Sequence, residues 1–171
     1  MMPTSDLLAK RDAVISYCGA YRYTLKRKWA AEFYPMLFVM LNPSTADAVD
    51  DDPTIRRCIG FAKREHCTAI LVLNLFAFRS PSPREMMAAS DPVGPNNDDY
   101  LCSAFFNAAL RGAPIVAAWG AHGNFQRRAA AVLSLATSQQ AKLMCLGRTS
   151  SGAPRHPLYL PKDAPLAEWK P

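Results

Sequence analysis

Four short and almost uninterrupted apolar runs alternate with polar, helix-forming segments, and this alternation restricts the possible folds more than any other feature of the chain. The runs are MLFVML at 36–41, AILVLNLFAF at 69–78, PIVAAW at 114–119 and KLMCLG at 142–147. An uninterrupted apolar run is typical of a strand that is buried on both faces. Strands that alternate with helices predict a parallel sheet with right-handed crossovers. We therefore expect an α/β fold with three α/β/α layers around a four-stranded parallel sheet.

Signals for helices lie between these runs. Asp52 is a suitable N-cap and Pro53 suits the first helical position. The apolar residues that follow recur with a helical period, and they are Ile55, Cys58, Ile59 and Ala62. Further helices are expected at about 84–89, at 97–111 and at about 124–137, the last with Asn124 as its N-cap.

The two ends of the chain lack this alternation. Residues 14–29 carry β-branched and aromatic residues around a Cys-Gly-Ala turn, which predicts an N-terminal β-hairpin or an extended arm. The tail from Arg148 is rich in proline and is expected to be mostly irregular. The 171 residues suit a single domain, residues 1–171.

Composition narrows the class of protein. No apolar run approaches the roughly 20 residues of a membrane span, and the N-terminus lacks the apolar centre of a signal peptide, so a cytoplasmic location without membrane contact is expected. Five scattered cysteines without a CxxC pair argue against disulfides and a zinc knuckle. Cys58 and Cys145 lie in apolar surroundings and are interpreted as core residues.

Basic residues outnumber acidic residues by 20 to 14. Such a surplus suits a polyanionic partner such as nucleic acid, although solvated basic faces are the plainer interpretation. Eight of the basic residues gather in two short segments, namely Arg22, Lys26, Arg27, Lys28, Arg56, Arg57, Lys63 and Arg64.

Polar residues follow the apolar runs, where ligands bind in parallel sheets. Asn74 is the most informative, because a carboxamide in an apolar strand costs free energy unless its hydrogen bonds are satisfied. Its donor pair and acceptor match the edge of a nucleobase; the alternative is that it ties two backbone segments together. Asn42, Pro43 and Ser44 form a rigid turn after the first run, which is either a site or a plain strand end.

Two further groups of residues are candidates for chemistry. Asp47, Asp50, Asp51 and Asp52 follow the first turn, where hard oxygen ligands suit Mg²⁺ or one carboxylate serves as a general base. His156 lies between prolines after the last run, where it can donate a hydrogen bond to developing negative charge. The chain has no P-loop, GxGxxG, HExxH or GxSxG motif, which argues against nucleotide triphosphate hydrolysis, dinucleotide redox chemistry and serine hydrolysis.

Several segments together resemble a bacterial family with a domain of unknown function. They are RYTLKRKW, MLNPSTADA with DDPTIRRC, LVLNLFAFR, AAWGAHG and RHPLYLPKDAPL. The LNPSTAD and RHPLYLP segments form its signature. This resemblance covers most of the chain and by itself implies no activity.

A second resemblance is to the uracil-DNA glycosylase superfamily. The matching pieces are LNPS at 41–44, LVLN at 71–74, AWG at 118–120 and HPL at 156–158, each after an expected strand and in the same order. The chain departs from the pattern at Asn42, where the most active members have Asp, and at Ser44, where Gly is usual. The late loop also lacks the Ser-Pro that normally follows His-Pro.

This second resemblance implies a glycosylase-like fold and hydrolysis of an N-glycosidic bond in DNA or a nucleotide, without a metal or other cofactor. Asn74 would read the base, Asn42 would orient water, His156 would stabilise the departing base, and Asp47 is a candidate base. Phe76 or Phe78 would stack on the base, and Leu158 or Tyr159 would fill the gap in the duplex. The remaining expected contact residues are Pro43, Ser44, Arg79, Trp119 and Gly120.

Two other classes of function stay open at this point. The first is a catalytically silent module that binds a modified nucleotide or a nucleic-acid end. The second is a phosphate-ester enzyme that uses Asp47, Asp51 and Asp52 with Mg²⁺. For the hydrolase and for the binding module, nucleic acid or a nucleotide is the expected partner. The sequence does not identify the base.

Overall fold

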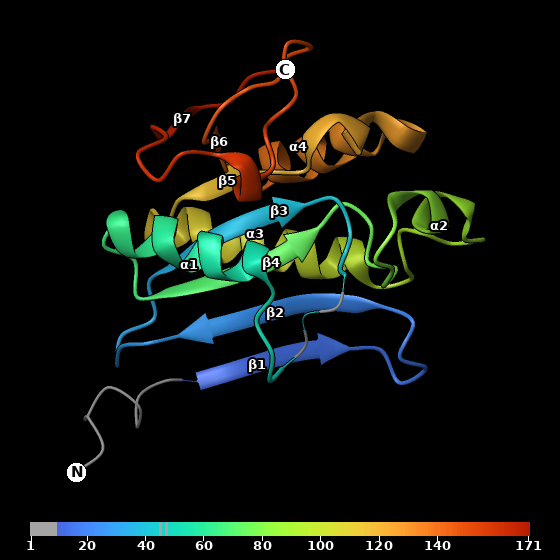
Figure 1. Cartoon of the computed structure of the whole chain (residues 1–171), viewed down its shortest axis with the longest axis horizontal. Coiled ribbons are helices and arrows are strands. Elements are labelled where there is room, and N and C mark those ends of the chain that lie inside the picture. The colour runs from blue at the N-terminus through green and yellow to red at the C-terminus, as the bar shows by residue number, and fades with distance from the viewer. Residues whose placement is uncertain (1–9, 45, 47) are drawn as a thin grey trace.

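A computed structural model describes residues 10–44, 46 and 48–171 of the chain, which form one mixed seven-stranded sheet in the order β1-β2-β4-β3-β5-β6-β7 (Figure 1). The strands are β1 (Lys10–Ile15), β2 (Arg22–Lys28), β3 (Pro35–Met40), β4 (Ala69–Asn74), β5 (Ile115–Ala117), β6 (Leu143–Cys145) and β7 (Ala167–Glu168).

The centre of the sheet is parallel and its edges are antiparallel. β3 pairs in parallel with β4 and β5, and β5 pairs in parallel with β6. β2 runs antiparallel to both β1 and β4, and β7 runs antiparallel to β6. The expectation of a four-stranded parallel sheet is therefore wrong for the sheet as a whole. The N-terminal strand pair joins it through β4, and a short C-terminal strand extends the other edge.

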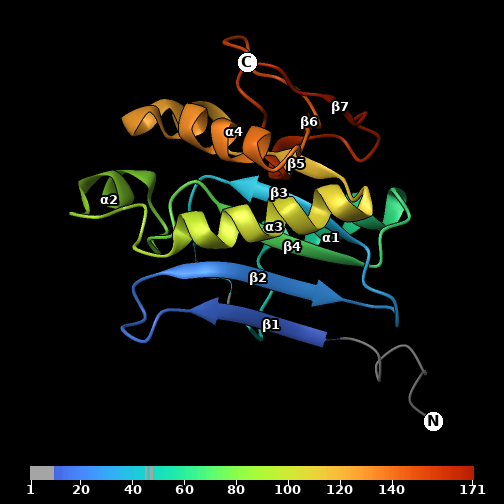
Figure 2. The ribbon, with the colours of Figure 1, turned by 180° about the vertical axis from the view of Figure 1, so that it is seen from behind.

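Helices cover both faces of the sheet. α1 (Pro53–Arg64) lies on the face nearest the viewer in Figure 1, and α3 (Asn97–Arg111) and α4 (Arg128–Ser138) lie on the face seen in Figure 2. The remaining helical segments are α2 (Pro83–Ala88), η1 (Gly120–Arg127) and η2 (Pro157–Tyr159). The expected α/β class with helices on both faces is confirmed.

Local signals explain most of the boundaries. The Asp52 side chain caps α1 by accepting a hydrogen bond from Ile55 N at 2.9 Å, as expected. Asn124 does not begin a helix, because η1 continues to Arg127 and α4 starts at Arg128. Left-handed backbone at Gln126 and Arg127, with φ of 50° and 55°, interrupts the helical path between η1 and α4.

Two apolar clusters form the core, one on each face of the sheet. Every residue of β3 is buried, as its uninterrupted apolar sequence indicates. Cys58 and Cys145 are 0% and 2% exposed, so their assignment to the core is confirmed. Among the residues that the structure describes, no helix combines the length and the apolar character that crossing a membrane requires.

Candidate functional site

A cavity of about 530 Å³ lies where β3, β4 and β5 reach their carboxyl ends. Its volume falls within the range of small-molecule sites, about 300–1,000 Å³. Its wall brings together Asn42, Asn74 and His156, which are far apart in the sequence. The other polar side chains of the wall are Arg22, Ser44, Asp52, Thr54, Ser80, His122 and Tyr159.

Asn74 is the last residue of β4, whereas the apolar run predicted a strand continuing to residue 78. Its side chain is 1% exposed, and Nδ2 has no hydrogen-bond partner among the described residues. A buried polar group left without a partner costs about 1–3 kcal/mol. A ligand in the cavity that offers an acceptor to Nδ2 would remove that cost.

Asn97 and Arg128 hold the backbone around Asn74. Nδ2 of Asn97 donates to Asn74 O and Leu75 O at 3.0 and 3.1 Å. Nε of Arg128 donates to Leu75 O at 2.7 Å, and its guanidinium pairs with Asp98. Neither residue is predictable from the sequence, because both lie among polar neighbours at helix starts and nothing in the pattern signals their burial.

The side chain of Asn42 is tied to the neighbouring loop. Nδ2 donates to Pro43 O at 3.2 Å and to Ser80 O at 3.0 Å, with Phe78 O at 3.5 Å. The amide therefore fastens the end of β3 to the chain that follows β4. Because its N–H groups are directed at carbonyls, its oxygen Oδ1 is the atom that can accept a hydrogen bond from a water molecule or a ligand.

Replacement of Asn42 by Asp is expected to destabilise the protein by about 1–3 kcal/mol, because a carboxylate would face the carbonyls that the amide now satisfies. Urea unfolding at pH 7 measures the change. Asn107→Asp is a matched control, because Asn107 is exposed on α3, where changes usually stay within about 0.5 kcal/mol. Equal stability of Asn42→Asp and the wild type would contradict this account of Asn42.

Asp52 lies in the cavity wall as well as at the start of α1. Its Oδ1 accepts from Ile55 N, and its Oδ2 accepts from the Ser44 hydroxyl at 3.2 Å. The interpretation of Asp52 as a cap is confirmed, but that interpretation alone gave no reason to place it in the site.

His156 precedes η2 and is half-buried. Its Nδ1 accepts a hydrogen bond from Leu158 N at 3.3 Å. Burial lowers the pKa of the imidazole below its usual value of 6.5, against an opposing effect of the Asp52 carboxylate. The neutral ring therefore predominates at pH 7, and with Nδ1 acting as acceptor its proton resides on Nε2.

Two aromatic residues of the cavity wall differ in exposure. Tyr159 is 76% exposed at the rim, with its ring centroid 6.2 Å from that of His156. Trp119 is only 3% exposed and packs edge-on against Trp169. Gly120, next to Trp119, also lines the cavity and has a φ of 72° that favours glycine.

Other predicted contact residues lie outside the cavity lining. Phe76 is fully buried and packs against Phe125 in the core, so it has no face available to a base. The guanidinium of Arg79 donates to Gly19 O, and the remaining three are buried or half-buried, namely Pro43, Phe78 and Leu158. Asp47, the candidate base, lies outside the described residues.

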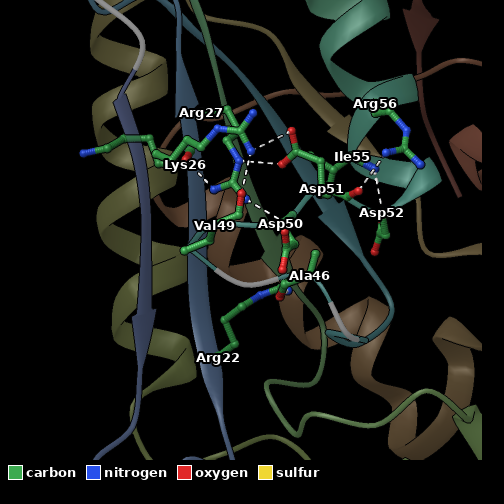
Figure 3. Close-up of polar contacts among 11 residues, drawn as sticks. Arg22, Lys26, Arg27, Ala46, Val49, Asp50, Asp51, Asp52, Ile55 and Arg56 are labelled. Carbon is green, nitrogen blue, oxygen red and sulfur yellow. Dashed lines mark hydrogen bonds and ion pairs between the residues drawn. The ribbon is translucent and has the colours of Figure 1, made fainter.

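The acidic loop after β3 is fastened to β2 by arginines (Figure 3). Arg22 donates to Ala46 O, and Arg27 Nε pairs with the Asp51 carboxylate at 2.7 Å. Both arginines are 3% exposed, so the first basic segment is not simply a solvated face. Asp51 also pairs with Arg11 at 3.3 Å. Within the described part of the chain, no three His, Cys, Asp or Glu residues gather as metal ligands would.

Fold and cavity together define an α/β protein with a polar cavity at the carboxyl ends of its central parallel strands. The chain belongs to the family described as "Protein of unknown function (DUF1643)", whose model matches residues 22–158. The matched range contains Asn42, Asn74 and His156. Searches of curated proteins and of solved structures found no match.

Proposed function

We propose that this protein binds a nucleobase in the cavity and hydrolyses its N-glycosidic bond, as members of the uracil-DNA glycosylase superfamily do. One observation carries the proposal. The buried, unpartnered Nδ2 of Asn74 shares a cavity with Asn42 and a neutral His156. The choice of N-glycosidic hydrolysis as the reaction comes from the resemblance of the surrounding motifs to that superfamily. The parallel central strands are compatible with its fold.

Each of the three side chains has a role that suits its surroundings. Asn74 donates to an acceptor on the edge of the base. Nε2–H of His156 donates to the negative charge that develops on the departing base, a kind of contact worth about 10²–10³ in rate. Oδ1 of Asn42 accepts from the attacking water and so orients it.

Access to a base in duplex DNA requires that the base be flipped out of the stack. Tyr159 is placed to assist, because it is exposed at the rim beside His156. Of the two residues expected to fill the gap, Leu158 and Tyr159, the exposed ring of Tyr159 is therefore favoured. Phe76 is buried in the core and cannot stack on a base. The large apolar side chains that line the cavity are Met40, Leu41, Ile55 and Trp119.

A basic hollow on α1 supports nucleic acid as the partner. It has a volume of about 390 Å³, and its wall carries four cationic side chains, namely Arg56, Arg57, Arg64 and Lys162. One of them, Arg64, also pairs with the Glu65 carboxylate at 2.8 Å. The first turn of α1 also contributes Thr54 and Ile55 to the cavity. A phosphate backbone that leaves the cavity along α1 would therefore meet these cations.

Affinity for single-stranded DNA is expected to fall as salt rises, because bound phosphates release their counterions. Truncation of both Arg56 and Lys162 to Ala should reduce the slope of log affinity against log salt by about 1.4, at about 0.7 for each phosphate contact. Fluorescence anisotropy from 50 to about 200 mM salt measures the slope. An Arg84→Ala, Arg148→Ala double variant, outside this hollow, is the control. An unchanged slope would remove α1 from the interface.

Formation of abasic sites tests the proposed activity directly. Oligonucleotides that each contain one damaged or mismatched base are incubated with the protein and then cleaved with alkali. Strand cleavage that persists in EDTA is the expected result. Cleavage that EDTA abolishes would favour the Mg²⁺-dependent phosphate-ester enzyme, and no cleavage of any substrate would refute glycosidic hydrolysis.

A binding module without catalysis is the second candidate, and the contacts of Asn42 favour it. An amide cannot take a proton from water, and this one is fastened to loop carbonyls. Tight binding of a nucleobase without formation of abasic sites would support this candidate over the hydrolase.

A further inference from the structure

We propose that Asp52 is the catalytic base of the cavity and accepts the proton of the attacking water. This inference rests on the proposed glycosidic hydrolysis and names the residue that the reaction needs besides Asn42 and His156. Hydrolysis of the bond requires a group that takes up a proton, and neither the amide of Asn42 nor that of Asn74 can do so. Among the described residues of the cavity wall, Asp52 supplies the only carboxylate.

Two hydrogen bonds fix the Asp52 carboxylate in one orientation. The backbone N–H of Ile55 holds Oδ1 at 2.9 Å, and the hydroxyl of Ser44 donates to Oδ2 at 3.2 Å. A carboxylate oxygen has two lone pairs, so Oδ2 keeps the capacity to accept a second hydrogen bond, from water. Its neighbours therefore hold the Asp52 carboxylate in place, and one acceptor position on Oδ2 is left for the attacking water.

The charge of the Asp52 carboxylate acts on the imidazole of His156. The Asp52 carboxylate raises the pKa of the His156 imidazole against the larger, opposite effect of burial. The two groups suit two different tasks, because a neutral imidazole can donate a hydrogen bond from Nε2 while a carboxylate can accept a proton. A base and a hydrogen-bond donor in one cavity are what hydrolysis with an anionic leaving group needs.

The proposed step balances without any further reactant. The water oxygen forms a bond to the anomeric carbon of the sugar, and its proton passes to Oδ2 of Asp52. The bond between the anomeric carbon and the base nitrogen breaks, and its electron pair leaves with the base, whose charge the Nε2–H of His156 stabilises. The proton on Asp52 then returns through water to the base, which leaves neutral beside a sugar with an anomeric hydroxyl.

Asp52→Asn tests this role with little disturbance of the fold, because Asn caps helices about as well as Asp. The wild-type protein and the variant are compared under single turnover, on whichever damaged-base oligonucleotide the wild type cleaves fastest. We expect the excision rate to fall by at least about 100-fold, the lower part of the range for a general base. Affinity for the corresponding free base should stay within about threefold. Asp163→Asn, an exposed site in the tail, is the control for the change in charge.

The outcomes separate this inference from the proposed function. Excision by the wild type with an equally fast Asp52→Asn variant would overturn the role of Asp52 alone. Loss of base affinity in step with the rate would also overturn it, because Asp52 would then only shape the cavity. No excision by the wild type would overturn both proposals. If Asp52→Asn does not fold, Asp52→Ser retains a capping hydroxyl and is subject to the same criteria.

Discussion

Asn74→Ala is expected to fold like the wild type and to bind a free nucleobase about 10- to 100-fold more weakly. The buried Nδ2 has no partner among the described residues, so the substitution removes a donor that no described protein atom satisfies and that is free to bind a ligand. The hydrogen bond to the ligand is worth about 1–3 kcal/mol, and each 1.4 kcal/mol is a factor of about ten. Isothermal calorimetry with a panel of nucleobases measures the loss.

Two other asparagines serve as controls for Asn74. Asn107→Ala, on the exposed part of α3, should change neither stability nor affinity appreciably. Asn97→Ala should lower stability, because its Nδ2 supports the carbonyls of Asn74 and Leu75. If Asn74→Ala unfolds while its folded fraction binds a base as tightly as the wild type, Asn74 is a structural tie.

His156→Ala is expected to slow base excision by about 10²–10³-fold, the usual effect of removing one donor to a developing anion. The affinity for the free base should change less than the rate. Because burial lowers the pKa of His156 below 6.5, the neutral ring should predominate from pH 8 down to that value. Titration of His156 should therefore have little effect on the rate in this range, and the ratio of wild-type to variant rates should change by no more than about twofold.

His122→Ala is the comparison for His156→Ala, because His122 is an exposed histidine on the same cavity. Its removal should affect the excision rate by only a small factor. Equal effects of the two substitutions would show that His156 contributes no special hydrogen bond. A ratio of rates that changes steeply between pH 6.5 and 8 would contradict the neutral-donor role.

The sequence predicted the central part of the fold well because burial on both faces leaves an unmistakable pattern. The apolar runs located β3, β4, β5 and β6, and the rule for ligands at strand ends brought Asn42 and Asn74 to one cavity. The docking of the N-terminal strand pair onto β4 was not predictable in the same way. That pairing joins residues 25–28 to 69–72, and the apolar pattern carries no information about which edge a hairpin meets.

The polar framework of the site was the harder part to predict. Arg22 and Asn97 are almost fully buried, yet each lies among residues that read as a polar surface. Their burial depends on contacts made across the fold, which no local period records. Asp52 illustrates the opposite difficulty: a satisfactory local explanation as a helix cap concealed its place in the cavity wall.

A crystal structure of the protein with a bound free nucleobase would test the central claim most directly. We expect a flat ring in the cavity of about 530 Å³, with an acceptor within hydrogen-bond distance of Asn74 Nδ2 and the ring edge facing His156. A base bound instead in the separate hollow of about 310 Å³ between β2 and α3, lined by Thr24, Leu71 and Tyr100, would contradict it. A cavity that stays empty at saturating nucleobase would contradict it equally.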